Sequence, residues 1–189
     1  LQSYQLNHQG YLLAVGTLEP RKNLNTVLYA YAKLPTSIKD RFPLVLAGHR
    51  GWLNDELDQN IQAIDPRHIR LLGYVPQADL PLITAGAKAM IYGSRYEGFG
   101  LPTIEAMASG TPVISSGAKA LQEVVGNAAQ IIHPDDASGF QQAMQALIED
   151  PQLCDHYRQL GLKRAAQFNW HITAQETAQL YQAVIHQRG

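Results

Sequence analysis

Short apolar runs alternate along this chain with longer stretches of helical periodicity, and no other feature constrains the fold as strongly. Such alternation is typical of repeated βαβ units, in which helices connect parallel strands. The pattern predicts six strands, over residues 11–15, 43–47, 69–72, 89–92, 112–115 and 129–132. We therefore expect an α/β fold with a Rossmann-like parallel sheet of about six strands flanked by helices.

The helices expected between these strands cover residues 23–33, 53–63, 77–85, 101–108 and 121–125. After the last strand the pattern is purely helical, over residues 137–149, 151–167 and 172–186. Large apolar side chains in these last helices have the spacing of core positions. They are Phe140, Leu147, Tyr157, Phe168, Trp170, Leu180 and Tyr181.

Composition excludes several classes of protein. The 189 residues are 46% hydrophobic, which suffices for the core of one α/β domain. A net charge of −1 and 16% charged residues provide no basic surface for nucleic acid. The lone Cys154 cannot form an internal disulfide, so cytoplasmic residence fits best. No apolar stretch approaches the roughly 20 residues that span a bilayer, so any membrane attachment would be peripheral or belong to a missing domain.

Two carboxylates, Glu97 and Glu105, flank a glycine-rich turn that follows an apolar strand and opens a helix. Gly98 and Gly100 allow a tight turn, and Pro102 suits the first turn of a helix. Free backbone amides at such a helix start favour an anion. The turn therefore predicts a site that binds a sugar nucleotide.

The two glutamates are expected to have different tasks. Glu97 lies at the carboxyl end of a strand, where open α/β sheets bind ligands. Glu105 lies farther into the helix, and its carboxylate can accept two parallel hydrogen bonds from neighbouring ribose hydroxyls. Taken alone, they would be read as a loop charge and a solvated helical residue. The Gly-Phe-Gly-Leu-Pro sequence between them favours the binding site.

A basic pair, Arg21 and Lys22, follows the first strand and precedes Asn23, a candidate helix cap. Two cations at a helix start oppose the helix dipole unless an anion binds. Arginine can fork onto phosphate oxygens while lysine supplies a compact charge, so the pair suits a diphosphate. Gly16 and Thr17, at the end of the same strand, are candidates to line the donor site.

Two segments together resemble one family. Residues 97–105, with the continuation AMASGTPVI over residues 106–114, resemble the E-x7-E signature of retaining glycosyltransferases of the GT-B fold, family 4. Residues 13–23, LAVGTLEPRKN, are similar to the first strand and phosphate-binding loop of that family's carboxyl-terminal domain. The similarity extends from about Tyr11 to the end of the chain.

The resemblance implies half of a two-domain enzyme with its active site in the cleft between the domains. Residues 1–10 would be a linker from a missing amino-terminal domain, with no targeting segment, and residues 11–189 a nucleotide-sugar-binding domain with carboxyl-terminal helices. In this family the final helix packs on the amino-terminal domain, so Tyr181 and Val184 would form an exposed apolar strip.

The family also implies roles for individual residues. Arg21 and Lys22 would bind the departing diphosphate and Glu97 the donor-sugar hydroxyls, so these three are the catalytic candidates. Residues 73–80 resemble the loop that meets the nucleobase, and residues 47–52 a loop that borders the donor pocket, where His49 fits a surface role or ligand contact equally. The donor-binding set is Gly16, Thr17, Arg21, Lys22, Tyr74, Val75, Glu97, Gly98, Phe99, Gly100, Leu101 and Glu105.

No metal site and no cofactor are expected. The seven histidines are scattered, with no H-E-x-x-H motif. Asp135 and Asp136 are adjacent rather than a D-x-D pair, so helix capping explains them better. Positive charge at the reaction centre would come from Arg21, Lys22 and helix amides.

The expected reaction transfers a sugar from a nucleoside diphosphate sugar to an acceptor hydroxyl with retention, in the cytoplasm or at the inner face of the membrane. GDP-mannose is the first candidate donor, as in polysaccharide and lipopolysaccharide mannosyltransferases, and UDP-sugars are the second. A glycan or lipid-linked acceptor would bind through the missing domain, so this domain alone is expected to be inactive.

Three alternatives stay open. A GT-B epimerase or phosphorylase shares the architecture, and a nucleotide-binding module without activity describes an isolated half. A dehydrogenase is the weakest alternative, because residues 98–103 carry only the first two glycines of G-x-G-x-x-G and follow the fourth strand.

Overall fold

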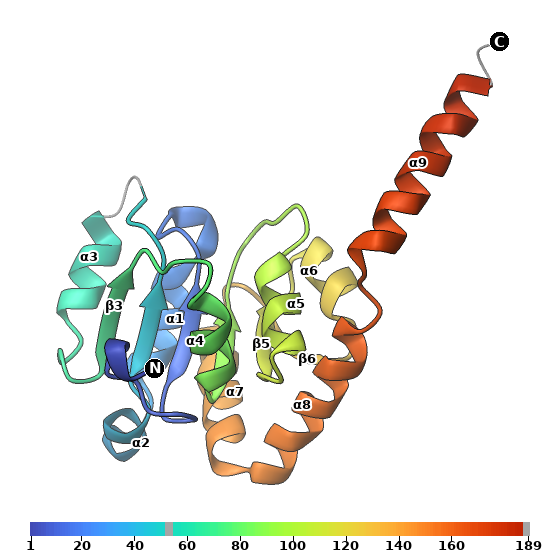
Figure 1. The fold of residues 1–189 in the computed structure, drawn as a ribbon. Helices are drawn as coiled ribbons and strands as arrows, with labels where there is room; N and C mark the ends of the chain where they lie inside the picture. Colours follow the sequence, from blue (N-terminus) through green and yellow to red (C-terminus); the bar gives the residue numbers. More distant parts are fainter. Residues whose placement is uncertain (52–54, 187–189) are drawn as a thin grey trace.

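The computed structural model describes residues 1–51 and 55–186, which form an α/β domain around one central sheet (Figure 1). Within these residues the sheet has six parallel strands in the order β3-β2-β1-β4-β5-β6. Each strand lies within one residue of its predicted bounds, so the expected Rossmann-like sheet is confirmed. The strands are β1 Leu12–Val15, β2 Leu44–Ala47, β3 Ile69–Gly73, β4 Ala89–Tyr92, β5 Val113–Ser116 and β6 Ala129–Ile132.

Helices flank the sheet on both sides (Figure 1). They are α1 Leu24–Ala32, α2 Thr36–Arg41, α3 Asp55–Gln62, α4 Leu80–Gly86, α5 Leu101–Ala108, α6 Lys119–Val125, α7 Ala137–Glu149, α8 Pro151–Ala165 and α9 Trp170–His186. The short α2 was not predicted, because its six residues bury a single side chain, Ile38, and show no helical periodicity. The helix predicted over residues 53–63 corresponds to α3, and its predicted start at residue 53 lies outside the described residues.

Alternating strand residues supply the two faces of the core. Leu12 and Leu44 pack with α1, α3 and α7 on one face, whereas Leu13 and Val45 pack with α4 on the other. Toward β5 and β6 that second face is covered by α5, α6 and α8, against which Met90 packs. Successive strand residues point to opposite faces, so strands buried on both faces must be apolar throughout.

The strand order reverses direction at β1. The chain continues from β1 to β2 on one side, and β4 then lies against the other side of β1. The loops after β1 and β4 therefore leave the sheet toward opposite sides and open a crevice at the carboxyl ends of these strands. This topology fixes where a ligand site can form.

The first ten residues pack against the domain. A 3-10 turn over Gln2–Tyr4 precedes Leu6, which is buried beside Tyr11 and Ile83. The Tyr4 hydroxyl donates a hydrogen bond to Asp79 Oδ2 at 2.7 Å. The segment expected to be a linker thus contributes side chains to the core under α4.

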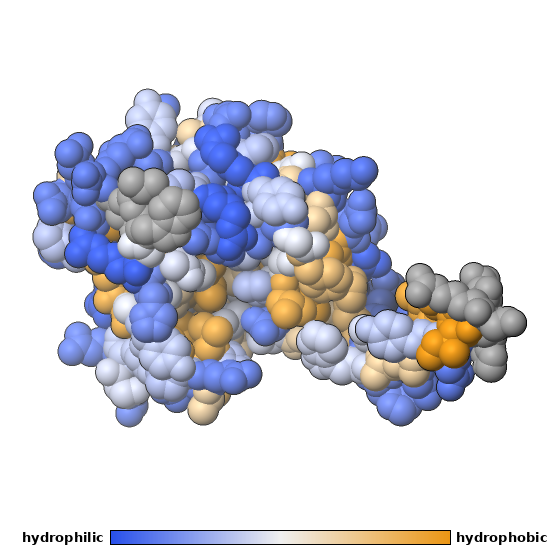
Figure 2. All heavy atoms as spheres, turned by 90° about the horizontal axis from the view of Figure 1, so that it is seen from above, coloured by the Kyte–Doolittle hydropathy of each residue, from blue (hydrophilic) through white to orange (hydrophobic). Residues whose placement is uncertain are grey.

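The last helix, α9, extends away from the domain (Figure 1). The predicted core positions Phe140 and Leu147 are fully buried, which confirms them. The prediction is wrong for Trp170 and Leu180, which are 75% and 62% exposed because no other described element covers α9. Tyr181 and Val184 are 66% and 43% exposed, as expected from the family resemblance rather than from core spacing. Apolar side chains are visible on this arm in Figure 2. Among the described helices, none is long and apolar enough to cross a membrane.

Candidate functional site

Segments that follow β1 and β4 meet at the carboxyl edge of the sheet through one glutamate. Lys22 Nζ lies 2.6 Å from Glu97 Oε1, and Arg21 Nη1 lies 2.8 Å from Glu97 Oε2. Each carboxylate oxygen thus has its own cation. Figure 2 looks onto this edge and shows hydrophilic side chains over its middle. The structure therefore joins the three residues predicted as catalytic, although 75 residues separate Lys22 from Glu97.

Tyr92, at the end of β4, completes this cluster and was missed by the sequence analysis. Its hydroxyl donates to Glu97 Oε1 at 3.0 Å and accepts from Lys22 Nζ at 2.9 Å. The ring is buried, and the Lys22 ammonium lies 5.0 Å from its centroid. The sequence did contain a signal for this role, because Tyr92 is the last residue of a buried strand and directly precedes the predicted ligand loop.

The partners of Glu97 lower its pKa against the effect of burial. Its side chain is 9% exposed, and burial alone would raise the pKa of the carboxyl. The hydrogen bond and charge of Lys22, helped by Tyr92, outweigh burial, so the pKa lies below the usual 4.5. Ser94 also lowers this pKa, yet its buried hydroxyl completes no hydrogen bond of normal geometry with the described residues.

The loop after β1 brings the two cations to this position. Gly16 has a φ of +134°, and a Cβ placed there would lie 3.1 Å from Lys22 Cε, so the lysine side chain passes directly over the glycine. A 3-10 turn over Pro20–Lys22 then reverses the chain before α1. Thr17 is exposed at the start of this loop. Gly16 thus lets Lys22 reach Glu97.

Asn23 ties this loop to two others instead of capping α1 as predicted. It is 5% exposed and makes no capping hydrogen bond, and its backbone is left-handed, with a φ of 55°. Its Nδ2 donates to the carbonyl oxygens of Gly93 at 3.1 Å and Pro134 at 2.7 Å. One buried amide therefore connects the loops that follow β1, β4 and β6.

The glycine-rich turn leads from Glu97 into α5. Gly100 has a φ of +100°, and a Cβ placed there would lie 2.3 Å from Leu121 Cδ2, so only glycine fits. Phe99 and Leu101 are each 43% exposed, and the Phe99 ring lies edge-on to Phe168 at 5.8 Å. Gly98 has open space around it. The turn is exposed at Gly98, Phe99 and Leu101, whereas Gly100 is buried.

Glu105 lies apart from the cluster around Glu97. It is exposed on α5 and forms no ion pair with any described residue. The two glutamates therefore have different environments, one neutralised by cations and one open to solvent.

The segment after β3 places Tyr74 and Val75 differently. Tyr74 is 62% exposed and stacks on the exposed His49 ring, with centroids 4.8 Å apart and planes at 17°. Val75 is buried in the core under α4, so only its backbone can meet a ligand. The stacked pair joins the ends of β2 and β3 and was not predicted, because it depends on how the two strands align.

Acidic residues beyond the cluster have other partners. Glu19 Oε1 accepts from Arg21 Nη2 at 2.5 Å, so Arg21 bridges two carboxylates. Asp136 caps α7 through the amide of Gly139, as predicted, whereas Asp135 pairs with Arg95 at 2.5 Å. In the part of the chain that the structure describes, no three His, Cys, Asp or Glu side chains gather in a group that could hold a metal ion.

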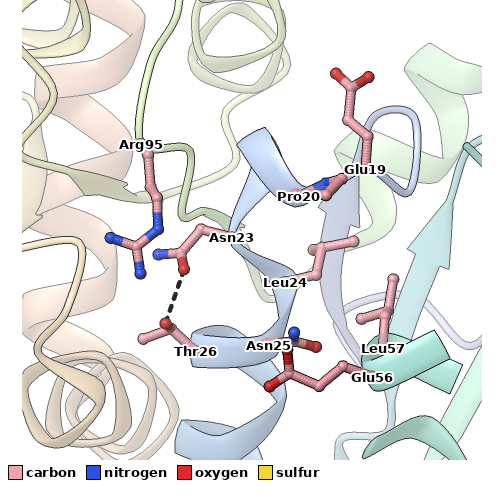
Figure 3. Close-up of a pocket in the computed structure, with 9 residues that line it drawn as sticks. All are labelled: Glu19, Pro20, Asn23, Leu24, Asn25, Thr26, Glu56, Leu57 and Arg95. Atoms are coloured by element: carbon pink, nitrogen blue, oxygen red, sulfur yellow. Dashed lines mark hydrogen bonds between the residues drawn. The ribbon is translucent and has the colours of Figure 1, made fainter. Parts of the chain in front are cut away.

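A hollow of about 370 Å³ lies beside the Pro20–Lys22 turn (Figure 3). Glu19, Pro20 and Arg95 line it together with residues of α1 and α3. The hollow does not include Glu97.

Comparisons with known proteins give a consistent result. The sequence profile of the family described as Glycosyl transferases group 1 matches residues 2–164. O-antigen chain mannosyltransferase B of Escherichia coli is 42% identical over 182 residues, covering 96% of this chain and 48% of that protein. O-antigen chain mannosyltransferase RfbU of Salmonella typhimurium is 31% identical over 150 residues, covering 79% and 41%. The chain spans about half the length of these relatives.

Solved structures have the same fold. A sucrose-phosphate synthase from Thermosynechococcus elongatus superimposes with a TM-score of 0.82 at 25% identity, covering 98% of this chain and 48% of the other. Anabaena HepE, solved in complex with UDP and glucose, gives a TM-score of 0.82 at 22% identity, covering 93% and 49%. In both, the match accounts for one half of a larger chain.

Proposed function

The chain belongs to the family Glycosyl transferases group 1 and has the fold of the carboxyl-terminal half of a GT-B glycosyltransferase, and on that premise we propose that it binds the sugar donor. The complete protein would transfer a hexose from a nucleoside diphosphate sugar to an acceptor hydroxyl, with retention at the anomeric carbon. Residues 1–10 would connect to an amino-terminal domain, and residues 11–189 form the donor domain.

The observation that carries this proposal is the meeting of Arg21, Lys22 and Glu97 at the point where the strand order reverses. Open α/β sheets bind their ligands at this point. The Arg21 side chain is 43% exposed, so an incoming diphosphate can draw it away from Glu19 without unfolding any element. Lys22, at 12% exposed, supplies a fixed charge.

In the proposed reaction the diphosphate departs with the bonding electrons of the glycosidic bond. Arg21 and Lys22 stabilise the negative charge that develops on its oxygens. The backbone amides of residues 98–101 donate to the sugar or phosphate, and Glu97 holds donor-sugar hydroxyls near the anomeric carbon. The acceptor oxygen forms the new bond on the same face of the anomeric carbon and passes its proton to the leaving phosphate. Retention follows, so Glu97 is not assigned as a covalent nucleophile.

The nucleoside would extend along the sheet edge toward β3. Glu105 would accept hydrogen bonds from the ribose hydroxyls, because its carboxylate is exposed and free of ion pairs with the described residues. The loop at Tyr74 and Val75 would meet the base, Val75 through its backbone. GDP-mannose is the first candidate donor, supported by the 42% identity to a mannosyltransferase, and a UDP-sugar is the second.

The acceptor would be a glycan or lipid-linked glycan bound mainly by the amino-terminal domain. The exposed apolar side chains of α9, among them Leu180, Tyr181 and Val184, would pack on that domain. We place the reaction in the cytoplasm, where the free thiol of Cys154 stays reduced, with peripheral attachment to the inner face of the membrane.

Calorimetric titration with GDP, UDP and GDP-mannose tests the donor site. Arg21→Ala and Glu105→Ala should each weaken binding about tenfold, which corresponds to the loss of one charged hydrogen bond. Arg67→Ala and Glu176→Ala are matched controls, since both residues lie on the surface away from the cluster. Equal affinity in all four variants would refute the assignment. Assaying the complete protein for transferred against epimerised sugar separates the transferase from a GT-B epimerase.

A further inference from the structure

The strongest feature outside the donor site is a groove over α1 that is lined by both polar and apolar residues. The hollow of about 370 Å³ adjoins a second of about 490 Å³, and the two share Asn25, Thr26 and Glu56. We infer that this groove, floored by α1 and walled by α3 on one side and by Arg95 and Asp135 on the other, binds a neutral oligosaccharide. The inference rests on the proposed function, because the oligosaccharide would be the glycan that the enzyme extends.

The dimensions of the groove suit a chain of sugars. Its two hollows reach from Glu19, at the carboxyl edge of the sheet, to Ala32, at the end of α1. The nine residues of α1 span about 13 Å, since an α-helix rises about 1.5 Å per residue. Each hollow lies within the range of roughly 300–1,000 Å³ found for small-molecule sites.

Amide groups are presented on both the floor and the wall. Asn60 Nδ2 donates to Asn25 Oδ1 at 3.1 Å, which fixes both side chains. With respect to the described residues, Asn25 keeps its own N–H donors and Asn60 keeps its oxygen acceptor. A sugar hydroxyl both donates and accepts, so a fixed amide pair can bind neighbouring hydroxyls of one ring.

An exposed aromatic ring lies farther along the floor. Tyr29 is 59% exposed, and the Lys33 ammonium lies 4.3 Å from its centroid. An aromatic ring with a polar tip offers an apolar face to the C–H face of a pyranose and a hydroxyl to its oxygens. Figure 3 shows the nearer hollow, with Arg95 and Thr26 on one side and Glu56 on the other.

The charges in the groove do not favour an anion. Glu19 pairs with Arg21 and Arg95 pairs with Asp135, both at 2.5 Å, so neither cation is free for a phosphate. Glu56 lines the groove without an ion pair to any described residue, so the lining carries no excess positive charge. A metal ion is disfavoured too, because the described part of the chain offers no group of three ligating side chains. A neutral polyhydroxyl ligand is the class that meets all of these conditions.

The groove lies next to the proposed donor site, which suits an acceptor glycan. Glu19 lines the groove and also accepts from Arg21, which contacts Glu97 in the donor site. The groove therefore ends at Glu19, which contacts Arg21, one of the proposed phosphate ligands. A glycan held over α1 would have its end near the site where the next sugar is added.

Titration of the chain with α-mannotriose, followed by amide NMR, tests the groove. Saturable binding should shift the side-chain amide signals of Asn25 and Asn60. The variants Tyr29→Ala and Asn60→Ala should each weaken it about tenfold, the loss expected for one good contact. Tyr181→Ala and Asn127→Ala, at exposed positions outside the groove, should bind as the parent does.

A parallel titration with GDP and UDP keeps the two proposals apart. Nucleotide binding that is unchanged in Tyr29→Ala and Asn60→Ala, while mannotriose binding falls, supports a separate groove. A folded chain that binds nucleotide but not mannotriose, or binds mannotriose equally in all variants, overturns the groove. A chain that binds mannotriose in the groove but no nucleotide supports the groove and counts against the donor site.

Discussion

Lys22 Nζ and Glu97 Oε1 lie 2.6 Å apart, in contact across the crevice between the ends of β1 and β4. Arg21 occupies the other carboxylate oxygen, so one glutamate pairs with both cations proposed to bind phosphate. A diphosphate must therefore compete with Glu97 for these cations. When the diphosphate succeeds, Glu97 becomes free to accept hydrogen bonds from sugar hydroxyls.

Glu97→Gln should separate binding from transfer. Without the competing charge, Arg21 and Lys22 are more available, so affinity for GDP or UDP in calorimetry should equal or exceed that of the parent. Transfer by the complete protein should fall on the order of 100-fold, the loss typical of one preorganised electrostatic contact. Weakened nucleotide binding together with full transfer activity would contradict the proposed role.

The same residue should make stability depend on pH. The folded-state pKa of Glu97 lies below its usual 4.5, so its contribution to stability is fully present above that value. It is lost as the pH falls through the folded-state pKa. Urea unfolding from pH 6 down to about pH 3 should show a smaller fall in the free energy of unfolding for Glu97→Gln than for the parent. Parallel curves for the two proteins would refute the ion-pair account.

Asn23 should matter for stability through its hydrogen bonds. Asn23→Ala leaves the buried carbonyls of Gly93 and Pro134 without their donor and keeps an unfavourable left-handed φ. We expect a loss of about 2–4 kcal/mol in urea unfolding, from unsatisfied acceptors and backbone strain.

Asn23→Gly removes the strain and leaves the loss of the hydrogen bonds. It should therefore be less destabilising than Asn23→Ala by about 1 kcal/mol. If both variants were as stable as the parent, the amide would not be holding the three loops together.

Two glycines of the same turn should respond differently to substitution. Gly100→Ala would place a methyl group 2.3 Å from Leu121 Cδ2 at a φ of +100°, at a cost of about 2 kcal/mol or more. Gly98→Ala meets no atom within 4 Å and should change the free energy of unfolding by less than about 0.5 kcal/mol. Thermal and urea unfolding of the matched pair checks this, and equal losses would contradict the described turn.

Removing α9 should leave the rest of the domain as stable as before. None of its residues with a described side chain is buried, so a chain ending at Asn169 should keep its urea midpoint, and its free energy of unfolding within about 0.5 kcal/mol. Amide hydrogens of α9 should exchange faster than those of β1, since an isolated helix is marginal in water. Slow exchange throughout α9 would show that the helix is stabilised by packing.

Sequence reasoning succeeded where local chemistry decides the structure. Apolar runs bounded by turn residues located every strand, and the Gly98 to Pro102 segment gave α5 its observed bounds. It failed where partners are distant in sequence: the acceptors of Asn23 lie 70 and 111 residues away. The prediction of core positions in α9 was wrong for another reason. Apolar spacing indicates which side chains form a buried face, but not which element or domain packs against that face.

The candidate site shows the same division. Arg21, Lys22 and Glu97 were selectable from charge and position, and the fold joined them. The part played by Tyr92 and the stacking of His49 on Tyr74 depend on strand register and side-chain direction, which a single sequence does not determine. Arg21 was expected only to bind phosphate. Its hydrogen bonds to two carboxylates, those of Glu97 and Glu19, are evident only from the folded structure.

The buried amide of Asn23 has a thermodynamic consequence for ligand association. Because it fastens three loops to one another when the chain folds, those loops lose their conformational freedom before any donor arrives. Preorganised loops have little ordering entropy left to lose on binding. The entropic penalty of capturing the donor then falls mainly on the donor and on the motion of the two domains.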